Sequence, residues 1–389
     1  MAMRRLTVSR ATLRFLRQGH PWVRPDKHTH GLEALSVGEA VELVDEDGVA
    51  AASALADPGA PVCARVYAFA PATAFDPLAA FARAWQRRAA LHADPDTDCY
   101  RMVHGEADGL PGLRVERYGA AVVVLVQAAC ARAAADAVAG DIARRLPNAA
   151  IAIREHLADL RREAPRARRF GGGELDAQAA FDVRELGVRL RARPFDGLAT
   201  GVYVDQRATR AWLRGDAAGR RVLNLFAYTG AFSASLLAAG AREALDVDLS
   251  APALRWAQEH AELNGVADRH RIEHADCLGF VTAAAARADA WDTVIIDPPT
   301  AAQGAGGWVA ARDYPRLLDH AVRLLAPGGR LVACLNTHGA RFDLDRALAR
   351  AAQAGGCVVE RGPALGIDLP LLKGFPEGRP YVLATCRRR

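Results

Sequence analysis

Three aspartates in the second half of the chain stand at the ends of segments with the character of buried strands. Asp248 ends EALDVD, Asp276 follows RIEHA, and Asp297 follows TVII and precedes Pro298 and Pro299. In a doubly wound parallel sheet, ligands bind beyond the carboxyl ends of the strands, so these carboxylates would meet at one binding edge. The two prolines hold the backbone extended and leave their carbonyls free as acceptors. This pattern predicts a rigid rim suited to the polar edge of a flat base.

A loop with a single glycine follows the first strand of this series, in the sequence FAYTGAF. Gly230 would let the backbone approach a ligand, and the helix that follows offers free N–H groups. A purely structural turn is the alternative. The full GxGxxG pattern of dinucleotide sites is absent, which disfavours a dinucleotide. We assign Phe226, Tyr228, Thr229 and Gly230 to the binding of a cofactor.

The position of Asp248 in the sequence, 18 residues after Gly230, is a further indication of a ligand site. A carboxylate at about this distance accepts hydrogen bonds from the two hydroxyls of a ribose. The alternative is a helix cap, a role that Ser250 can fill by itself. Asp246 would face the same side of its strand but lie deeper. Asp276, after the third strand, could meet an adenine amino group.

The elements that must position these residues alternate from about residue 191 onward. Strands are predicted over RVLNLFA, REALDVDLS, RIEHADCLGF, WDTVIIDPP and GGRLVACLN, and helices over AFSASLLAAG, APALRWAQEHAELNG and ARDYPRLLDHAVRLL. Alternation of this kind predicts an α/β fold, with a mostly parallel Rossmann-like sheet and helices on both faces.

Two smaller parts precede this one. Residues 1–72 contain short strands separated by Gly, Asp and Pro, which predicts a small β-barrel. Residues 73–190 begin with the helical stretch PLAAFARAWQRRAALHA and continue in an α+β pattern. We therefore predict three domains, with the Rossmann-like domain spanning residues 191–389.

Composition agrees with a cytoplasmic protein. The 389 residues are 51% hydrophobic and 24% charged, and no run reaches the roughly 18 apolar residues of a membrane helix. The first residues lack the apolar core of a secretory signal. Seven cysteines stand singly, which favours reduced thiols and gives no zinc-type spacing. The net charge of +5 is compatible with a nucleic-acid partner but is a weak signal.

The chain as a whole resembles a bacterial family of large-subunit ribosomal RNA methyltransferases that join a PUA domain to a class I methyltransferase domain. The similar segments are GHPWV, YRMVHGEADGLPGLRVERYG, TGVYVDQRATR, LNLFAYTGAFS, VDLS, LNG, IDPPT and LPLLKGFPEGRPY. The resemblance implies a PUA barrel for RNA docking and S-adenosylmethionine as the cofactor. It also implies 23S ribosomal RNA as the partner, naked or partly assembled, because a flipped base needs access. No membrane partner is expected, and a homodimer stays open.

The resemblance also implies roles for individual residues. Asp248 would bind the ribose of the cofactor, Asp276 its adenine end, and Asp297 would lie beside the transferable methyl group. Three consecutive residues would line the cofactor entrance: Asp205, Gln206 and Arg207.

The atom that receives the methyl group depends on the strand GGRLVACLN. Cytosine-C5 members of the family use a cysteine here, because a thiolate must first add to C6 of the base. Aligned on the glycines, that place falls on Asn336, while Cys334 lies two residues earlier, about 6–7 Å along a strand. Asn336 cannot be a nucleophile, although its amide can bind a base edge. Guanine N7 needs no covalent catalyst, so a nitrogen target of this type is favoured.

We accordingly assign Asp297, Pro298, Pro299 and Asn336 to the catalytic site, with no metal. Two alternatives remain: a cytosine-C5 methyltransferase that uses Cys334, and a noncatalytic RNA-binding factor for ribosome assembly. A nicotinamide dehydrogenase is disfavoured by the missing glycines and by DPP.

Other residues carry weaker signals. Trp308 or Tyr314 could stack on a flipped base, or could pack a loop and a helix. Five arginines in the segment LRREAPRARRF could contact phosphate or could belong to a solvated loop. They are Arg161, Arg162, Arg166, Arg168 and Arg169.

Overall fold

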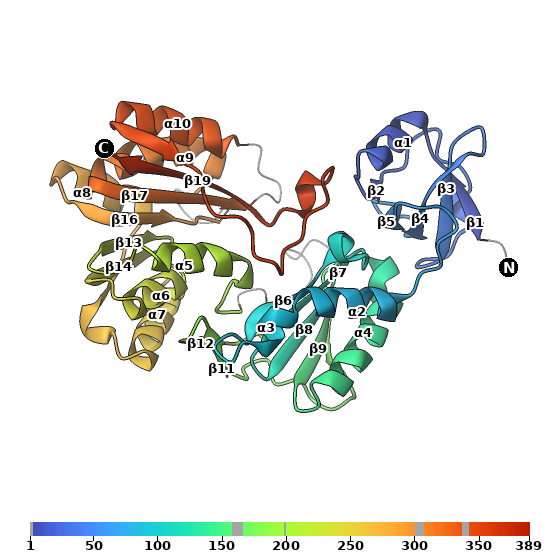
Figure 1. Ribbon diagram of the computed structural model, residues 1–389, viewed down its shortest axis with the longest axis horizontal. Helices are drawn as coiled ribbons and strands as arrows, with labels where there is room; N and C mark the ends of the chain where they lie inside the picture. The colour runs from blue at the N-terminus through green and yellow to red at the C-terminus, as the bar shows by residue number, and fades with distance from the viewer. Residues whose placement is uncertain (1–2, 158–165, 198–199, 300–306, 337–341) are drawn as a thin grey trace. The chain divides into compact units, whose positions relative to one another are not determined.

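The computed structural model describes residues 3–157, 166–197, 200–299, 307–336 and 342–389. Their contacts divide the chain into two units (Figure 1). The first unit comprises Met1–Val183, Ala192–Thr200 and Gly366–Gly378, and the second comprises Arg184–Arg191, Gly201–Leu365 and Arg379–Arg389. The first two predicted domains therefore belong to one unit. A segment near the C-terminus, Gly366–Gly378, also belongs to this unit. No helix in the described stretches is long and apolar enough to cross a membrane.

The N-terminal part of the first unit is a five-stranded sheet in the order β1-β3-β4-β5-β2. Its strands are β1 (Arg4–Thr7), β2 (Trp22–Val23), β3 (Ala40–Val44), β4 (Ala50–Ala56) and β5 (Ala64–Ala68). A helix that we did not predict, α1 (Arg10–Arg17), packs Leu13 and Leu16 against the core of this sheet. The hydroxyl of Ser9 caps the helix by accepting a hydrogen bond from the backbone N–H of Thr12.

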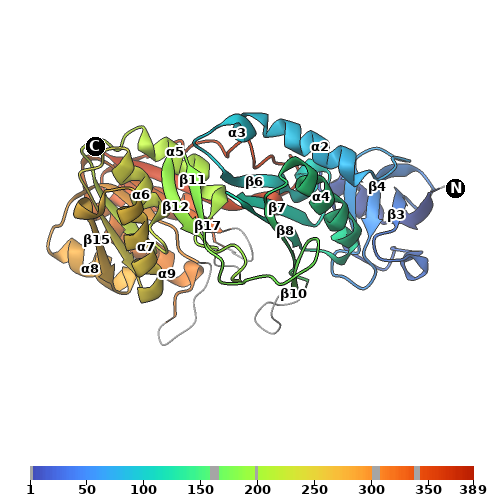
Figure 2. The same ribbon diagram turned by 90° about the horizontal axis from the view of Figure 1, so that it is seen from below.

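The rest of the first unit is built on a second five-stranded sheet, in the order β10-β9-β8-β7-β6. Its strands are β6 (Cys99–His104), β7 (Leu113–Tyr118), β8 (Ala121–Val126), β9 (Ala150–Glu155) and β10 (Arg166–Arg169). The helices α2 (Pro77–Arg87) and α4 (Arg132–Arg145) pack against each other and against this sheet (Figure 2). The single helix predicted over residues 77–93 is in fact two, because Arg88 leaves the helical conformation before α3 (Ala89–Ala93).

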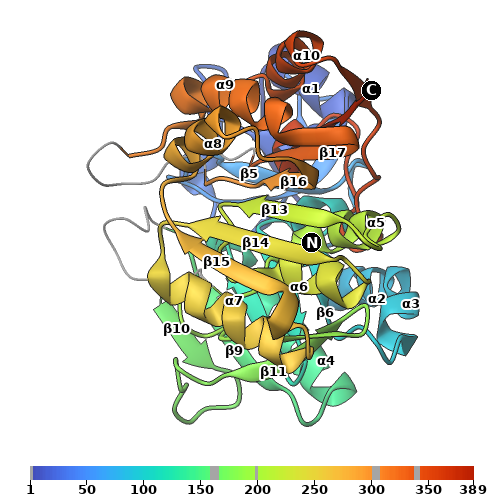
Figure 3. The same cartoon turned by 90° about the vertical axis from the view of Figure 1, so that its left-hand side faces the viewer.

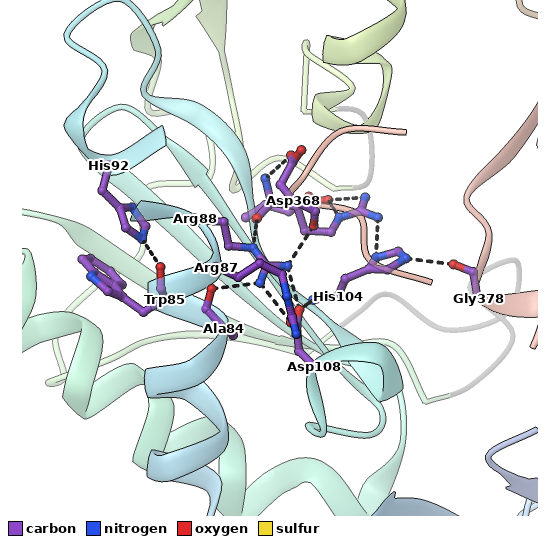
Figure 4. A network of polar contacts seen from close by, with 11 residues as sticks. Ala84, Trp85, Arg87, Arg88, His92, His104, Asp108, Asp368 and Gly378 are labelled. Carbon is purple, nitrogen blue, oxygen red and sulfur yellow. Dashed lines mark hydrogen bonds and ion pairs between the residues drawn. The ribbon is translucent and has the colours of Figure 1, made fainter. Parts of the chain in front are cut away.

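A buried polar network holds the last segment of the first unit in place (Figure 4). The guanidinium of Arg88 donates to both carboxylate oxygens of Asp108, at 2.9 and 2.7 Å, and to the backbone carbonyl of Asp368 at 2.8 Å. His104 Nε2 lies 2.8 Å from the carbonyl oxygen of Gly378. A buried charge is costly unless it is paired, so the contacts of Arg88 fix the Asp368 end of the segment. The hydrogen bond between His104 and Gly378 holds its other end.

The second unit contains a seven-stranded sheet in the order β15-β14-β13-β16-β17-β19-β18 (Figure 3). The first five strands in this order run parallel, and β19 pairs antiparallel with both β17 and β18. The strands are β13 (Arg221–Leu225), β14 (Glu243–Asp248), β15 (His270–His274), β16 (Trp291–Ile296), β17 (Leu325–Asn336), β18 (Cys357–Glu360) and β19 (Tyr381–Arg388). The hairpin β11 (Phe181–Glu185) and β12 (Val188–Ala192) links the two units in the chain.

Helices cover both faces of this sheet because successive residues of its central strands are buried on alternate sides. Leu223 and Leu225 pack with one set of helices and Val222 with the other. The first set is α8 (Cys277–Ala286), α9 (Ala310–Ala321) and α10 (Leu344–Ala354). The second is α5 (Arg207–Arg214), α6 (Ala231–Ala238) and α7 (Ala251–Leu263). The predicted α/β fold with a mostly parallel Rossmann-like sheet is confirmed.

One predicted strand is wrong in its second half. RIEHADCLGF was expected to be extended throughout, but β15 ends at His274 and α8 begins at Cys277. Asp276 causes the change, because its carboxylate caps α8 by accepting a hydrogen bond from the backbone N–H of Gly279 at 2.7 Å.

Candidate active site

A cavity of about 800 Å³ opens at the carboxyl ends of the parallel strands of the second unit. Residues that follow β13, β14, β15 and β16, together with the end of β17, line it. The remaining lining residues come from the segment before α5, from the start of α9 with the residues just before it, and from the start of β19. The lining consists of Tyr203, Asp205, Gln206, Phe226, Tyr228, Asp248, Leu249, Asp276, Cys277, Leu278, Asp297, Pro298, Pro299, Gly307, Trp308, Asp313, Asn336, Pro380 and Tyr381.

Ten of the thirteen predicted site residues line this cavity. They are Asp205, Gln206, Phe226, Tyr228, Asp248, Asp276, Asp297, Pro298, Pro299 and Asn336. The other three, Arg207, Thr229 and Gly230, do not. Arg207 is buried at the start of α5, and the Thr229 hydroxyl donates to the carbonyl oxygen of Gly201 at 2.5 Å. The hydrogen bond of Thr229 thus ties the loop between β13 and α6 to the segment before α5.

Gly230 serves packing. Its φ is +66°, and a Cβ atom on it would lie 2.4 Å from Asp246 Oδ2 and 2.7 Å from the Cβ of Ala257. The floor beneath the loop therefore requires a glycine here, as the structural alternative for this turn expects. The assignment of Gly230 to cofactor binding stays a prediction. Asp246 is fully buried and lies deeper than Asp248, as predicted.

The loop between β13 and α6 is held in an unusual backbone conformation. Phe226 and Tyr228 have φ values of +56° and +51°, a region that side chains other than glycine rarely adopt. Two hydrogen bonds stabilise it: the Tyr228 N–H donates to Asp248 Oδ2 at 2.9 Å, and the Phe226 N–H to Cys277 Sγ at 3.2 Å. Backbone strain of this kind concentrates at ligand sites.

Asp248 therefore orients the loop and still faces the cavity. Its Oδ1 accepts a hydrogen bond from the Ser250 N–H at 2.8 Å, while its Oδ2 accepts the one from Tyr228. Each carboxylate oxygen has a second acceptor site left. The cap of α7 is made by the hydroxyl of Ser250, which accepts from the Ala253 N–H. The helix-cap alternative for Asp248 is therefore unnecessary.

The opposite wall carries an unusual carboxyl group. Gln206 Nε2 donates to Asp297 Oδ2 at 3.3 Å, and burial together with the nearby Asp205 carboxylate raises the pKa of Asp297 to about 7. Strongly shifted carboxyl groups in clefts mark candidate functional residues.

The ends of β16 and β17 are tied together behind this wall. The buried hydroxyl of Tyr314 lies 2.6 Å from the carbonyl oxygen of Cys334 and 3.3 Å from that of Ile296. Cys334 is fully buried, does not line the cavity, and has a thiol pKa raised well above its usual value by burial. Asn336, two residues later, is exposed and does line it.

The two predicted stacking aromatics differ, because Trp308 lines the cavity and Tyr314 does not. Tyr314 is fully buried, and Trp308 is 7% exposed and packs against Phe226 at 4.8 Å between ring centroids. Sequence reasoning missed Tyr203, which is 50% exposed and lines the cavity. It also missed Leu249, Pro380 and Tyr381. The segments TGVYVDQRATR and LPLLKGFPEGRPY, already singled out, contain three of these four residues.

Comparison with known proteins identifies the family. Residues 147–362 match the model of S-adenosylmethionine-dependent methyltransferases, and residues 6–69 match that of PUA-like domains. The chain is an S-adenosylmethionine-dependent methyltransferase. S-adenosylmethionine is its cofactor.

Relatives of this methyltransferase match along almost the whole chain. A ribosomal RNA large subunit methyltransferase of Deinococcus radiodurans is 34% identical, over 90% of this chain and 89% of its own length. Ribosomal RNA large subunit methyltransferase I of Citrobacter koseri is 31% identical, over 98% of this chain and 99% of its own. The solved structure of the methyltransferase SMU.776 with SAH has the same fold, with a TM-score of 0.81 and 20% identity, over 99% of this chain and 100% of its own.

The cavity suits a nucleoside cofactor in both size and lining. Its volume lies within the roughly 300–1,000 Å³ of small-molecule sites. The apolar side chains of Phe226, Leu249 and Leu278 accompany the carboxylates of Asp248 and Asp276. A flat base with a ribose needs both kinds of surface.

Substituting Gly230 tests the floor of the cavity. Gly230→Ala should lower the free energy of unfolding by about 1–2 kcal/mol through its positive φ and by a further 1–3 kcal/mol through overpacking. Gly265→Ala is the matched control, because Gly265 also has a φ of +66° but no atom within 4 Å of the added Cβ. Urea unfolding of both variants isolates the packing contribution, and equal losses of stability would contradict it.

Proposed function

We propose that this methyltransferase methylates a base of 23S ribosomal RNA at a nitrogen atom, with guanine N7 as the leading candidate. The relatives named above support ribosomal RNA as the substrate, since they match the chain from end to end. The PUA-like domain supports an RNA partner, which we expect to be naked or partly assembled. A homodimer stays a prediction, which sedimentation velocity tests.

The observation that carries the choice of a nitrogen is the pair of residues at the end of β17. Attack on cytosine C6 needs a thiolate in the cavity, but Asn336 occupies the wall and Cys334 is buried behind it. Cys277 does line the cavity, although the residue is 1% exposed. Its thiol contacts two backbone groups and has a pKa raised by burial. None of these residues is suited to a covalent step.

The proposed roles follow the geometry of the walls. Asp248 would accept hydrogen bonds from the ribose hydroxyls, and Asp276 from the adenine amino group through the oxygen that does not cap α8. Asp297 would face the methyl-bearing sulfur, with Pro298 and Pro299 shaping the rim. When bound, S-adenosylmethionine supplies an electrophilic methyl group on a positively charged sulfur.

A nitrogen lone pair can attack such a methyl group without prior activation. The residues of the cavity then have only to align the base and exclude water, which are large effects in themselves. Asn336 can both donate to and accept from a base edge. The half-exposed ring of Tyr203 offers a stacking surface beside Asp205 and Gln206.

The nucleoside product decides between the candidate functions. Purified protein with labelled S-adenosylmethionine should transfer label to large-subunit RNA from a deletion strain, and nucleoside mass spectrometry should find 7-methylguanosine. Asp297→Ala should abolish transfer, whereas Cys334→Ser should retain it. If 5-methylcytidine appears and Cys334→Ser is inactive, the cytosine alternative is right. Binding of RNA without transfer in any assembly state would favour the assembly factor.

The pKa of Asp297 predicts a pH dependence of cofactor binding. A carboxyl group with a pKa of about 7 is mostly neutral at pH 6 and mostly ionised at pH 8. Because a sulfonium cation favours the ionised form, the affinity for S-adenosylmethionine should rise over this interval, by up to about tenfold per unit that binding lowers the pKa. Calorimetry should show a much smaller change for S-adenosylhomocysteine, whose sulfur is neutral. A parallel rise for both ligands, or a rise that persists in Asp297→Asn, would remove Asp297 from this role.

The ring of Tyr203 is testable by truncation. Stacking of one base on an aromatic side chain contributes about 1–3 kcal/mol, so Tyr203→Ala should lower kcat/KM for RNA roughly 5- to 150-fold. Tyr203→Phe keeps the ring and should remain near the wild type. The affinity for S-adenosylmethionine, measured by calorimetry, should be unchanged in both variants. Equal activity of the alanine and phenylalanine variants would show that the ring is not a stacking surface.

A further inference from the structure

Three of the four residues of β10, the edge strand of the central sheet of the first unit, are exposed arginines. We propose that this edge is a docking surface for the sugar–phosphate backbone of RNA. It consists of four arginines, one at the start of α4 and three on β10: Arg132, Arg166, Arg168 and Arg169. We call it the β10 arginine surface, and its assignment to RNA rests on the function proposed above.

Strand register places Arg166 and Arg168 on one face of the edge strand β10, and Arg169, which lies opposite Ala152, on the other face. Arg166 lies opposite Glu155 and Arg168 opposite Ile153 on β9, so both arginines project from the same face. Their Cα atoms are about 6–7 Å apart, as for any residues two apart on a strand. A hollow of about 350 Å³ lies between them and α4. It is lined by Arg132, Ile153, Glu155, Arg166, Ala167 and Arg168.

The charges on this surface are not balanced. Arg132 donates to both carboxylate oxygens of Glu155, at 2.9 and 3.0 Å, and Arg168 pairs with Asp136. The hydrogen bonds from Arg132, with the charges of Arg166 and Arg168, lower the pKa of Glu155. Arg166 and Arg169 have no ion pair with any residue that the structure describes. Among the described residues, four guanidinium groups at this edge thus stand against the two carboxylates of Glu155 and Asp136.

Protection of a sheet edge alone does not account for this composition. Edge strands avoid pairing with other chains through short length, charged side chains, proline or bulges, none of which calls for arginine in particular. β10 has three arginines in four exposed residues and no acid. Elsewhere on the same domain, Arg144 and Arg145 share the carboxylate of Asp141, at 2.6 and 2.5 Å.

Arginine forks match phosphate oxygens in geometry, which makes RNA backbone the occupant that this surface fits. Contacts with phosphate are independent of sequence and fix the position of a nucleic acid on a protein. The β10 arginine surface would therefore hold RNA on the first unit, independently of the base that is modified. Arg161 and Arg162, from the same predicted group, lie outside the described residues.

The dependence of RNA binding on salt tests this surface. We would titrate protein-free large-subunit ribosomal RNA with wild type and with the double variant Arg166→Gln/Arg169→Gln, in 50–200 mM salt without cofactor. Loss of two phosphate contacts should make the slope of log affinity against log salt shallower by about 1.4–1.8. The variant should bind about tenfold more weakly at 50 mM, and the gap should close roughly tenfold toward 200 mM.

The control variant is Arg144→Gln/Arg145→Gln, which removes the same charge from the neighbouring helix. It should keep the wild-type slope. An unchanged slope in the β10 variant, or an equal change in the control, would overturn the proposal. So would polyglutamate binding that needs the same two arginines and outcompetes RNA, since it would assign the surface to an acidic protein.

Two further measurements separate this proposal from the proposed function. Thermal unfolding of the variant should match wild type, because both substituted side chains are exposed. Calorimetry with S-adenosylmethionine should also be unchanged. A wild-type enzyme that binds RNA with this salt slope but transfers no methyl group would refute the proposed reaction and leave the docking surface standing.

Discussion

The active site depends on one buried carboxylate beneath it. Asp246 Oδ1 accepts hydrogen bonds from Asn224 and Ser233, and its Oδ2 lies 2.8 Å from His270 Nε2. These partners come from β13, α6 and β15, so a single side chain on β14 joins four elements under the cavity. Burying a carboxylate without hydrogen-bond partners would cost several kcal/mol of folding free energy, so the three partners of Asp246 must all be present. Position 230 must be glycine for the same reason, because a Cβ atom there would collide with this carboxylate.

Residues farther along the same strands form the walls of the cavity above this floor. Asp248, two residues beyond Asp246, faces the same side of β14 and holds the strained loop through the Tyr228 N–H. Across the cavity, the Tyr314 hydroxyl binds the chain at the ends of β16 and β17, behind Asp297. The half of the cavity suited to a nucleoside is thus rigidly preorganised, a condition under which positioning alone can accelerate a reaction.

The sequence predicted what depends on local pattern and strand order. The alternation of apolar runs gave the fold class, and the aspartates at strand ends converge because parallel strands finish at one edge. What it could not supply were tertiary constraints. The packing role of Gly230 is not visible in the sequence, because Asp246 and Ala257, which would collide with a Cβ atom at this position, come from other elements. Tyr314 looked available because its burial is not visible in the neighbouring residues of the sequence. The elements β18, β19 and α10 were not predicted, because they follow a segment without a clear hydrophobic period.

The return of Gly366–Gly378 to the first unit has a consequence for how this enzyme can be divided. After that segment, the chain enters the second unit once more as β19, which lies between β17 and β18 in the sheet. A gene fragment that stops before the crossing would leave an internal gap in the sheet. It would also lose Tyr381 from the cavity. No single cut of the polypeptide therefore separates the first unit from the second, because the chain crosses between them more than once.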